Sequence, residues 1–88
     1  MSGTSPDSTE LAERRRIGAT IRVLREARGL KPDQLANSIQ ISRPYLANIE
    51  AGRKPLTPVL LGRVAAALNS PHGAIVREGY FVSEQVSA

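Results

Sequence analysis

Apolar side chains recur at intervals of three and four residues along most of this 88-residue chain, which is the spacing of an α-helix with one buried face. No segment alternates with the two-residue period of a β-strand. The pattern therefore predicts an all-α domain of four to five helices. The expected helices cover residues 8–28, 32–39, 43–51 and 58–68, with a shorter fifth helix that begins at residues 70–71.

Residues that favour helix ends stand at the boundaries of these segments. Ser42 and Thr57 are good N-caps, and Pro32 suits the first turn of the second helix. Gly29 and Asn69 suit the left-handed position that follows a helix. The helix limits are therefore encoded locally.

The chain is long enough for one small domain. We expect a disordered polar tail over residues 1–7, a folded domain over residues 8–76 and a C-terminal tail over residues 77–88. The apolar positions that we assign to its core are Ile17, Ile21, Leu24, Leu35, Ala36, Ile39, Ile41, Leu46, Ile49, Leu60, Leu61, Val64 and Leu68.

Basic residues are concentrated in the expected domain. The chain has a net charge of +4, but residues 11–63 hold eleven Lys and Arg against four acidic residues. The flanks are acidic. This distribution is typical of a protein that binds a polyanion, although a basic surface can also serve solubility alone.

The third expected helix has two different faces. Leu46 and Ile49 lie three residues apart and point to the core. The opposite face has no large aliphatic residue, so it is either a solvated surface or a surface for a partner. Its Arg and Asn side chains match the edges of guanine and adenine in the DNA major groove. The residues on or beside this face are Arg43, Pro44, Tyr45, Ala47, Asn48 and Ala51.

The segments IRVLREARGL (21–30), QLA (34–36), ISRPYLANIEAGRKP (41–55) and VAAAL (64–68) together resemble the Cro/repressor, or XRE-type, helix-turn-helix family. The resemblance covers about residues 17–75 and implies a lambda-repressor-like fold, with a helix-turn-helix over residues 32–51. It implies that the third helix is the recognition helix. It also implies a structural ion pair between Arg25 and Glu50.

The resemblance gives named residues roles on double-stranded DNA. Arg43 and Asn48 are expected to read bases, with apolar contacts from Pro44 and Ala47. Phosphate and sugar contacts are expected from Lys31, Tyr45, Arg53 and Lys54, with help from the run Arg14, Arg15 and Arg16.

Two positions depart from the family pattern. Gln40 stands in the turn where the family has Gly, and a non-Gly residue at positive φ costs roughly 1 kcal/mol. Lys31 and Pro32 replace a Thr-Gln pair whose Gln approaches a phosphate. That hydrogen bond cannot be carried over, and Lys31 supplies charge instead.

Catalysis is not expected. The chain has no Cys and a single His, His72, so it lacks the residues for a metal site or a His-based dyad. Phosphate-binding glycine loops and serine nucleophile motifs are missing. We expect no cofactor, no metal and no membrane segment, and a cytoplasmic location.

The sequence is compatible with several roles for the C-terminal region. Ile75, Val76, Tyr80 and Phe81 can close the core, form a homodimer contact or bind a protein partner.

We predict a sequence-specific transcriptional repressor that acts as a dimer on a palindromic operator. The alternative is an antitoxin or co-regulator that uses the same fold chiefly for protein–protein interaction.

Overall fold

The computed structural model describes residues 8–77 and 79–81, and no strand occurs among them. The four long helices expected from the sequence are present, each within one residue of its expected limits. They are α1 (Ser8–Ala27), α2 (Pro32–Ser38), α3 (Arg43–Glu50) and α4 (Pro58–Leu68), followed by the 3-10 turn η1 (His72–Ala74). The all-α prediction is confirmed.

The expected fifth helix is reduced to the single turn η1. Gly73 lies in the middle of this turn, and Gly is the poorest helix former after Pro. Three residues are also too few to nucleate an α-helix without strong caps. The tail expected over residues 1–7 lies outside the described residues, as do residues 78 and 82–88 of the tail expected over residues 77–88.

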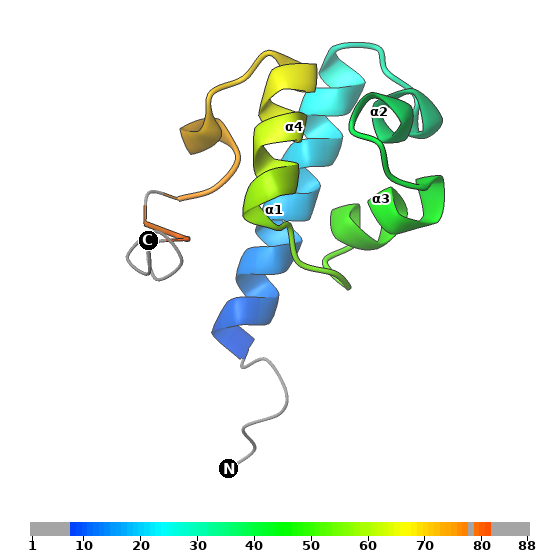
Figure 1. Ribbon diagram of the computed structural model, residues 1–88. Helices are drawn as coiled ribbons and strands as arrows, with labels where there is room; N and C mark the ends of the chain where they lie inside the picture. The colour runs from blue at the N-terminus through cyan, green and yellow to red at the C-terminus, as the bar shows by residue number, and fades with distance from the viewer. Residues whose placement is uncertain (1–7, 78, 82–88) are drawn as a thin grey trace.

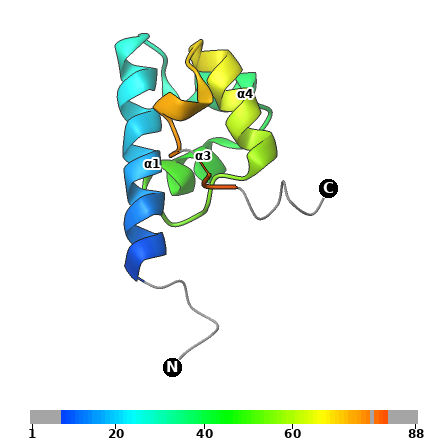
Figure 2. The ribbon, with the colours of Figure 1, turned by 90° about the vertical axis from the view of Figure 1, so that its left-hand side faces the viewer.

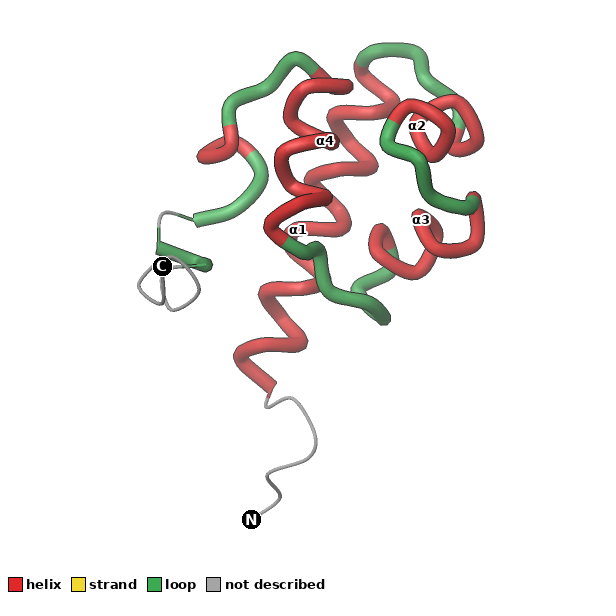
Figure 3. The backbone as a smooth tube through the Cα atoms, in the orientation of Figure 1, coloured by secondary structure: helices red, strands yellow, loops and turns green. Residues whose placement is uncertain are grey.

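The helices form two groups around one core (Figure 1). The long helix α1 runs beside α4 and also contacts α3, while α2 and α3 pack on each other at one side. The segment after α4 crosses the other side, over both α1 and α4 (Figure 2). Only a short loop joins α2 to α3 (Figure 3), so the pair forms a compact unit, and α3 is the member that packs on α1.

Local capping explains most of the helix limits. The Ser42 and Thr57 hydroxyls accept from the N–H groups of Tyr45 and Leu60, at 3.1 and 3.2 Å. Asn69 ends α4 in the left-handed region, with φ 52°. These three predicted caps are confirmed.

The start of α2 is capped differently, because a lysine side chain has no acceptor. The Gln34 side-chain oxygen reaches back and accepts from the backbone N–H of Lys31 at 2.7 Å. This is the returning half of a capping box. The first turn of α2 is therefore held without an N-cap side chain.

The turn between α2 and α3 contains the residue that departed from the family pattern. Gln40 has φ 63°, so it occupies the left-handed region that Gly would occupy at little cost. The Ile41 N–H still donates to the Ala36 carbonyl at 3.0 Å. The turn keeps its geometry and absorbs the backbone strain of a non-Gly residue.

The core is built from aliphatic side chains of all four helices. Leu24 and Ile41 are only partly buried at its edge, whereas the other predicted core residues are buried. The core also takes up Leu56 from the loop before α4, and Ala65, Ile75 and Val76.

The C-terminal segment is tied to α1 by charged groups. Arg16 donates to the Ile75 carbonyl at 3.4 Å, and Arg77 donates to the Glu13 carboxylate at 3.2 Å. A hydrogen bond from Arg16, aided by Arg77, lowers the pKa of Glu13 despite its partial burial. Residues 75–77 are thus held against α1.

Candidate DNA-binding surface

The end of α3 is held directly against α1. At Gly18 the two backbones come so close that a Cβ atom would lie 2.3 Å from the Ile49 carbonyl oxygen and 2.5 Å from that of Glu50. Only glycine permits this approach. This contact was not predicted from the sequence. Its signal was a glycine between the buried Ile17 and Ile21 in a helix otherwise rich in good helix formers.

The predicted pair between Arg25 and Glu50 is confirmed. Arg25 donates from Nε and Nη2 to the two carboxylate oxygens of Glu50, at 2.8 and 3.2 Å, and from Nη1 to the Leu30 carbonyl at 2.9 Å. The two side chains are only 7% and 11% exposed. The hydrogen bond to Glu50 raises the pKa of Arg25. This bidentate pair locks α3 onto α1.

The outward face of α3 carries the predicted base-reading residues. Arg43, Pro44 and Ala47 are exposed, whereas Asn48 is partly buried. Tyr45 is partly buried and packs against the core, so only part of its ring is available to a sugar-phosphate backbone. The exposed face is free of bulky side chains and fits close approach to another surface.

Asn48 and Arg53 are joined rather than separate. Arg53 Nε donates to the Asn48 side-chain oxygen at 2.7 Å. The backbone N–H groups of Arg53 and Lys54 also donate to the Asn48 carbonyl, at 2.9 and 3.2 Å. From the sequence, Asn48 was expected at bases and Arg53 at phosphates, and a bond between them was not predicted.

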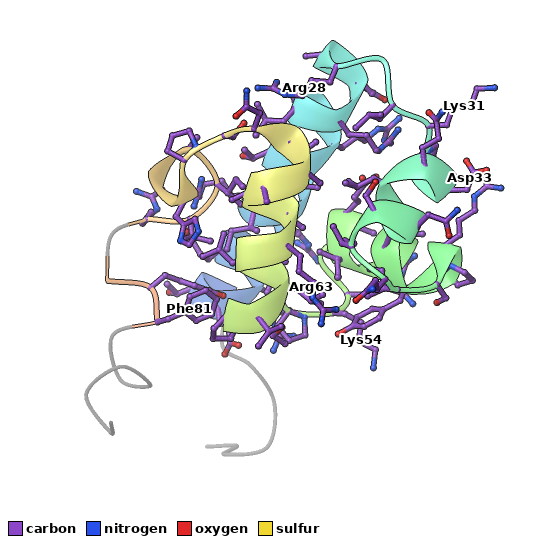
Figure 4. The ribbon with its side chains drawn as sticks, turned by 45° about the horizontal axis from the view of Figure 1, so that its top comes forward. Arg28, Lys31, Asp33, Lys54, Arg63 and Phe81 are labelled. Atoms are coloured by element: carbon purple, nitrogen blue, oxygen red, sulfur yellow. The ribbon has the colours of Figure 1, made fainter. Side chains whose placement is uncertain are left out.

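Many of the basic side chains are used within the fold. Arg63 donates to the Ile39 carbonyl at 3.2 Å, where it satisfies the C-terminal end of α2. Arg28 donates to the Leu68 carbonyl at the end of α4 and to Ser70 Oγ. Both positions are visible in Figure 4. These cations stabilise helix ends and are not free for a ligand.

The three consecutive arginines at positions 14–16 also differ in whether they form an ion pair within the described structure. Arg14 pairs with Glu10 at 2.9 Å and Arg16 with Glu13 at 2.6 Å. Arg15 is exposed and lies against Gly52, whose Cβ position would be 2.6 Å from Arg15 Cγ. Of the triplet, only Arg15 adjoins the loop that follows α3.

Four cations in the described part of the chain have no side-chain partner within it, and they lie in or next to α2, α3 and the loop that follows α3. Arg43 begins α3, Lys31 precedes α2, Lys54 follows α3, and Arg15 adjoins the loop after α3. Figure 4 shows Lys31 and Lys54 directed outward from the body of the protein. Cations thus lie at the start of α3, in the loop after it and before α2, which suits a helix that lies in a groove between phosphates.

The family model described as "Helix-turn-helix domain" matches residues 16–75, more than half of the chain. The chain belongs to the helix-turn-helix family. Its helix order and its similar proteins place it in the Cro/repressor, or XRE, type. The family resemblance seen in the sequence is therefore confirmed.

Relatives of this helix-turn-helix chain include an immunity repressor protein of Bacillus phage phi105, 38% identical over 69 residues, which are 78% of this chain. The chain spans about half of that repressor, 48% of its length.

Solved structures of similar fold include a restriction-modification controller protein and a gene regulator. The restriction-modification controller protein C.AhdI from Aeromonas hydrophila has a TM-score of 0.70 and 28% identity, over 73% of this chain and 97% of that one. The clp gene regulator ClgR from C. glutamicum has a TM-score of 0.68 and 32% identity, over 70% of this chain and 80% of that one. The fold is thus shared with proteins that are named as a controller and as a gene regulator.

None of the helices in residues 8–77 and 79–81 combines the length and the apolar composition that crossing a membrane requires.

Proposed function

We propose that this protein is a sequence-specific transcriptional repressor that binds a palindromic operator as a homodimer. The observation that carries the proposal is the surface of α3. Its exposed side carries small residues and no large aliphatic side chain, and cations that have no side-chain partner among the described residues lie at the start of α3 and in the segments next to it. The family membership and the regulators of similar fold support the same role.

The residues around α3 take distinct roles on DNA. Arg43, in the first turn of α3, donates to guanine O6 and N7, and Asn48 reads a neighbouring base pair. Pro44 and Ala47 contribute apolar contacts. The second set holds the backbone: Lys31, Arg53 and Lys54 contact phosphates, and Tyr45 packs on sugar-phosphate.

We expect a dimer because the surface with which α3 of one chain contacts bases is small. One short helix reaches only a few base pairs, whereas two copies related by two-fold symmetry read half-sites about 34 Å apart. Tyr80 and Phe81 are candidates for the contact between copies. Their rings are in edge contact, 4.7 Å between centroids, and remain partly exposed. Figure 4 labels Phe81 on the side of the molecule away from Lys31.

The C-terminal residues considered for partner binding fall into two pairs. Ile75 is fully buried and Val76 is 7% exposed, so both close the core of this chain and are not available to another protein. Tyr80 and Phe81 retain exposed surface, and burial raises the pKa of Tyr80. A contact with another copy therefore involves the second pair.

Selection of bound sites from random double-stranded DNA tests the proposal. We expect a two-fold symmetric consensus, with half-site centres about 10 base pairs apart or a multiple of that spacing. Sedimentation of the complex should give two chains per site. An absence of any consensus, with a protein partner captured through Tyr80 and Phe81, would favour the antitoxin or co-regulator alternative.

A further inference from the structure

We propose that Asp33 faces a DNA phosphate at the start of α2 and limits the affinity of this protein for DNA of every sequence. This inference rests on the proposed function, in which α3 lies in the major groove. It concerns a carboxylate that has no role in the proposed DNA contacts. It gives Asp33 an effect on DNA binding that is opposite to the effect of its neighbour Lys31.

Asp33 differs from the other acidic residues in the described structure. Each of the other four is paired with an arginine. These pairs are Glu10–Arg14, Glu13–Arg16, Glu26–Arg22 and Glu50–Arg25. Asp33 is exposed, and its carboxylate has no ion-pair or hydrogen-bond partner among residues 8–77 and 79–81. Its negative charge is therefore not neutralised within the fold.

The neighbouring lysine does not neutralise Asp33 either. Lys31 is the N-cap of α2, and Asp33 is the second residue of the helix. Side chains that lie two positions apart along a helix do not face each other. Figure 4 labels both residues at the same outer edge of the protein. One positive and one negative charge thus lie at the start of α2, and each can act on a ligand.

The first turn of α2 is also short of donors for a phosphate. Pro32 has no N–H group. The Lys31 N–H donates to the Gln34 side-chain oxygen at 2.7 Å. One backbone donor at the start of α2 is therefore lacking and another is already used. The Asp33 carboxylate adds acceptors at a place where a phosphate requires donors.

The docking of a helix-turn-helix brings this end of α2 to the sugar-phosphate backbone. The first helix of the motif crosses the backbone, while the second helix lies in the major groove. An acid on α2 therefore faces phosphates and not the base edges, where a carboxylate can accept from cytosine N4. Salt screens two charges only in part when they lie within about 8 Å of each other. Asp33 thus repels the phosphate that Lys31 attracts.

A structural role explains why an acid is tolerated at this position. A carboxylate in the first turn interacts favourably with the helix dipole. Asp33→Asn removes the charge and keeps the size of the side chain, so it separates the two roles. The dipole role alone predicts slightly lower stability with unchanged or weaker DNA binding. Repulsion of a phosphate predicts tighter DNA binding.

The test measures the affinity of Asp33→Asn for the selected operator and for unrelated DNA over a range of salt concentrations. We expect binding to both DNAs to be tighter by roughly 2- to 5-fold for each half-site. The fall of log K with log salt should be steeper by up to about 1 unit for each half-site. Asp33→Glu keeps the charge and should stay within twofold of the wild type.

Glu26→Gln is the matched control. It removes the same charge from an exposed acid that is already paired with Arg22, at 3.1 Å. Its affinity for DNA should stay within twofold of the wild type. An equal gain in Glu26→Gln and Asp33→Asn would show an effect of net charge alone and overturns the inference.

A second measurement identifies the phosphate that Asp33 faces. Operators that carry one uncharged methylphosphonate in each half-site are compared with the unmodified operator. The phosphate that Lys31 contacts is the one whose replacement abolishes the effect of Lys31→Ala. The gain of Asp33→Asn should disappear at this replacement and persist at the others. A gain that survives every replacement overturns the inference.

Two further outcomes separate the inference from the proposed function. Unchanged or weaker binding by Asp33→Asn, together with a symmetric consensus, overturns the inference while the proposed function stands. A wild-type protein that binds no DNA overturns both.

Discussion

Gly18 of α1 and Glu50 of α3 meet backbone to backbone, with room for a hydrogen atom but not for a methyl group. A Cβ on Gly18 would lie 2.5 Å from the Glu50 carbonyl oxygen and 2.7 Å from its carbon. The same Glu50 uses its side chain to hold Arg25 further along α1. The end of α3 is therefore held against α1 at two points, by the backbone of Glu50 at Gly18 and by the carboxylate of Glu50 at Arg25.

The close approach at Gly18 predicts that Gly18→Ala is destabilising, although Ala is a better helix former by about 1 kcal/mol. The atoms in the way belong to a backbone and cannot move independently, so overpacking should cost about 1–3 kcal/mol in net stability. Denaturant unfolding measures the change.

Gly62→Ala in α4 is the control, because the added methyl group would meet no atom within 4 Å. It should stabilise the protein by up to about 1 kcal/mol. Stabilisation by both substitutions would mean that α1 and α3 do not approach as closely as described.

The Arg25–Glu50 pair predicts a large loss of stability for Glu50→Gln. A buried guanidinium would lose its charged partner, which typically costs about 3 kcal/mol or more. Glu26→Gln breaks the exposed pair with Arg22, in which the side chains are 54% and 64% exposed, and should cost less than ~1 kcal/mol.

Thermal unfolding of both variants, together with operator preference, decides the role of Glu50. A changed preference at an undiminished melting temperature would place Glu50 on the DNA-binding surface instead of in the support of α3.

Arginines with and without an ion-pair partner in the described structure should contribute differently to the salt dependence of DNA binding. Arg15 has no internal partner in the described structure and lies against Gly52, so it is placed to contact a phosphate. Arg15→Ala should lower the slope of log K against log salt by about 1 unit. Arg22→Ala removes an arginine that pairs with Glu26 at 3.1 Å and should leave the slope unchanged. Equal slopes for wild type and Arg15→Ala would remove Arg15 from the interface.

Local signals in the sequence were enough for the helices and most of the core. Ser42, Thr57 and Asn69 acted at the expected ends because capping depends on neighbouring residues alone. The contact of Gly18 with α3 could not be derived in this way, since a tolerated helix glycine carries no sign of its partner.

The surface was harder to predict than the core. Whether an arginine is free depends on which carbonyls and carboxylates the fold brings near it. Arg63 proved to satisfy the end of α2, and Arg53 to hold Asn48, only once the helices were placed. A charge count cannot separate such residues from Lys31 or Lys54, whose side chains point away from the protein.

The first turn of α3 gives the most direct test of base reading. Arg43 is exposed, begins the helix and has no partner in the described residues, so its planar fork of donors is available to guanine O6 and N7. Arg43→Ala should weaken binding to the selected operator by about 1–3 kcal/mol and relax the preference at one position of each half-site. The measurement compares the consensus with single-base variants for both proteins.

Lys31→Ala is the control, because a phosphate contact has no base preference and its loss weakens every sequence alike. If Arg43→Ala produced the same uniform loss with the base preference intact, Arg43 would belong with the phosphate contacts, because a base contact cannot be removed without relaxing the position that it reads.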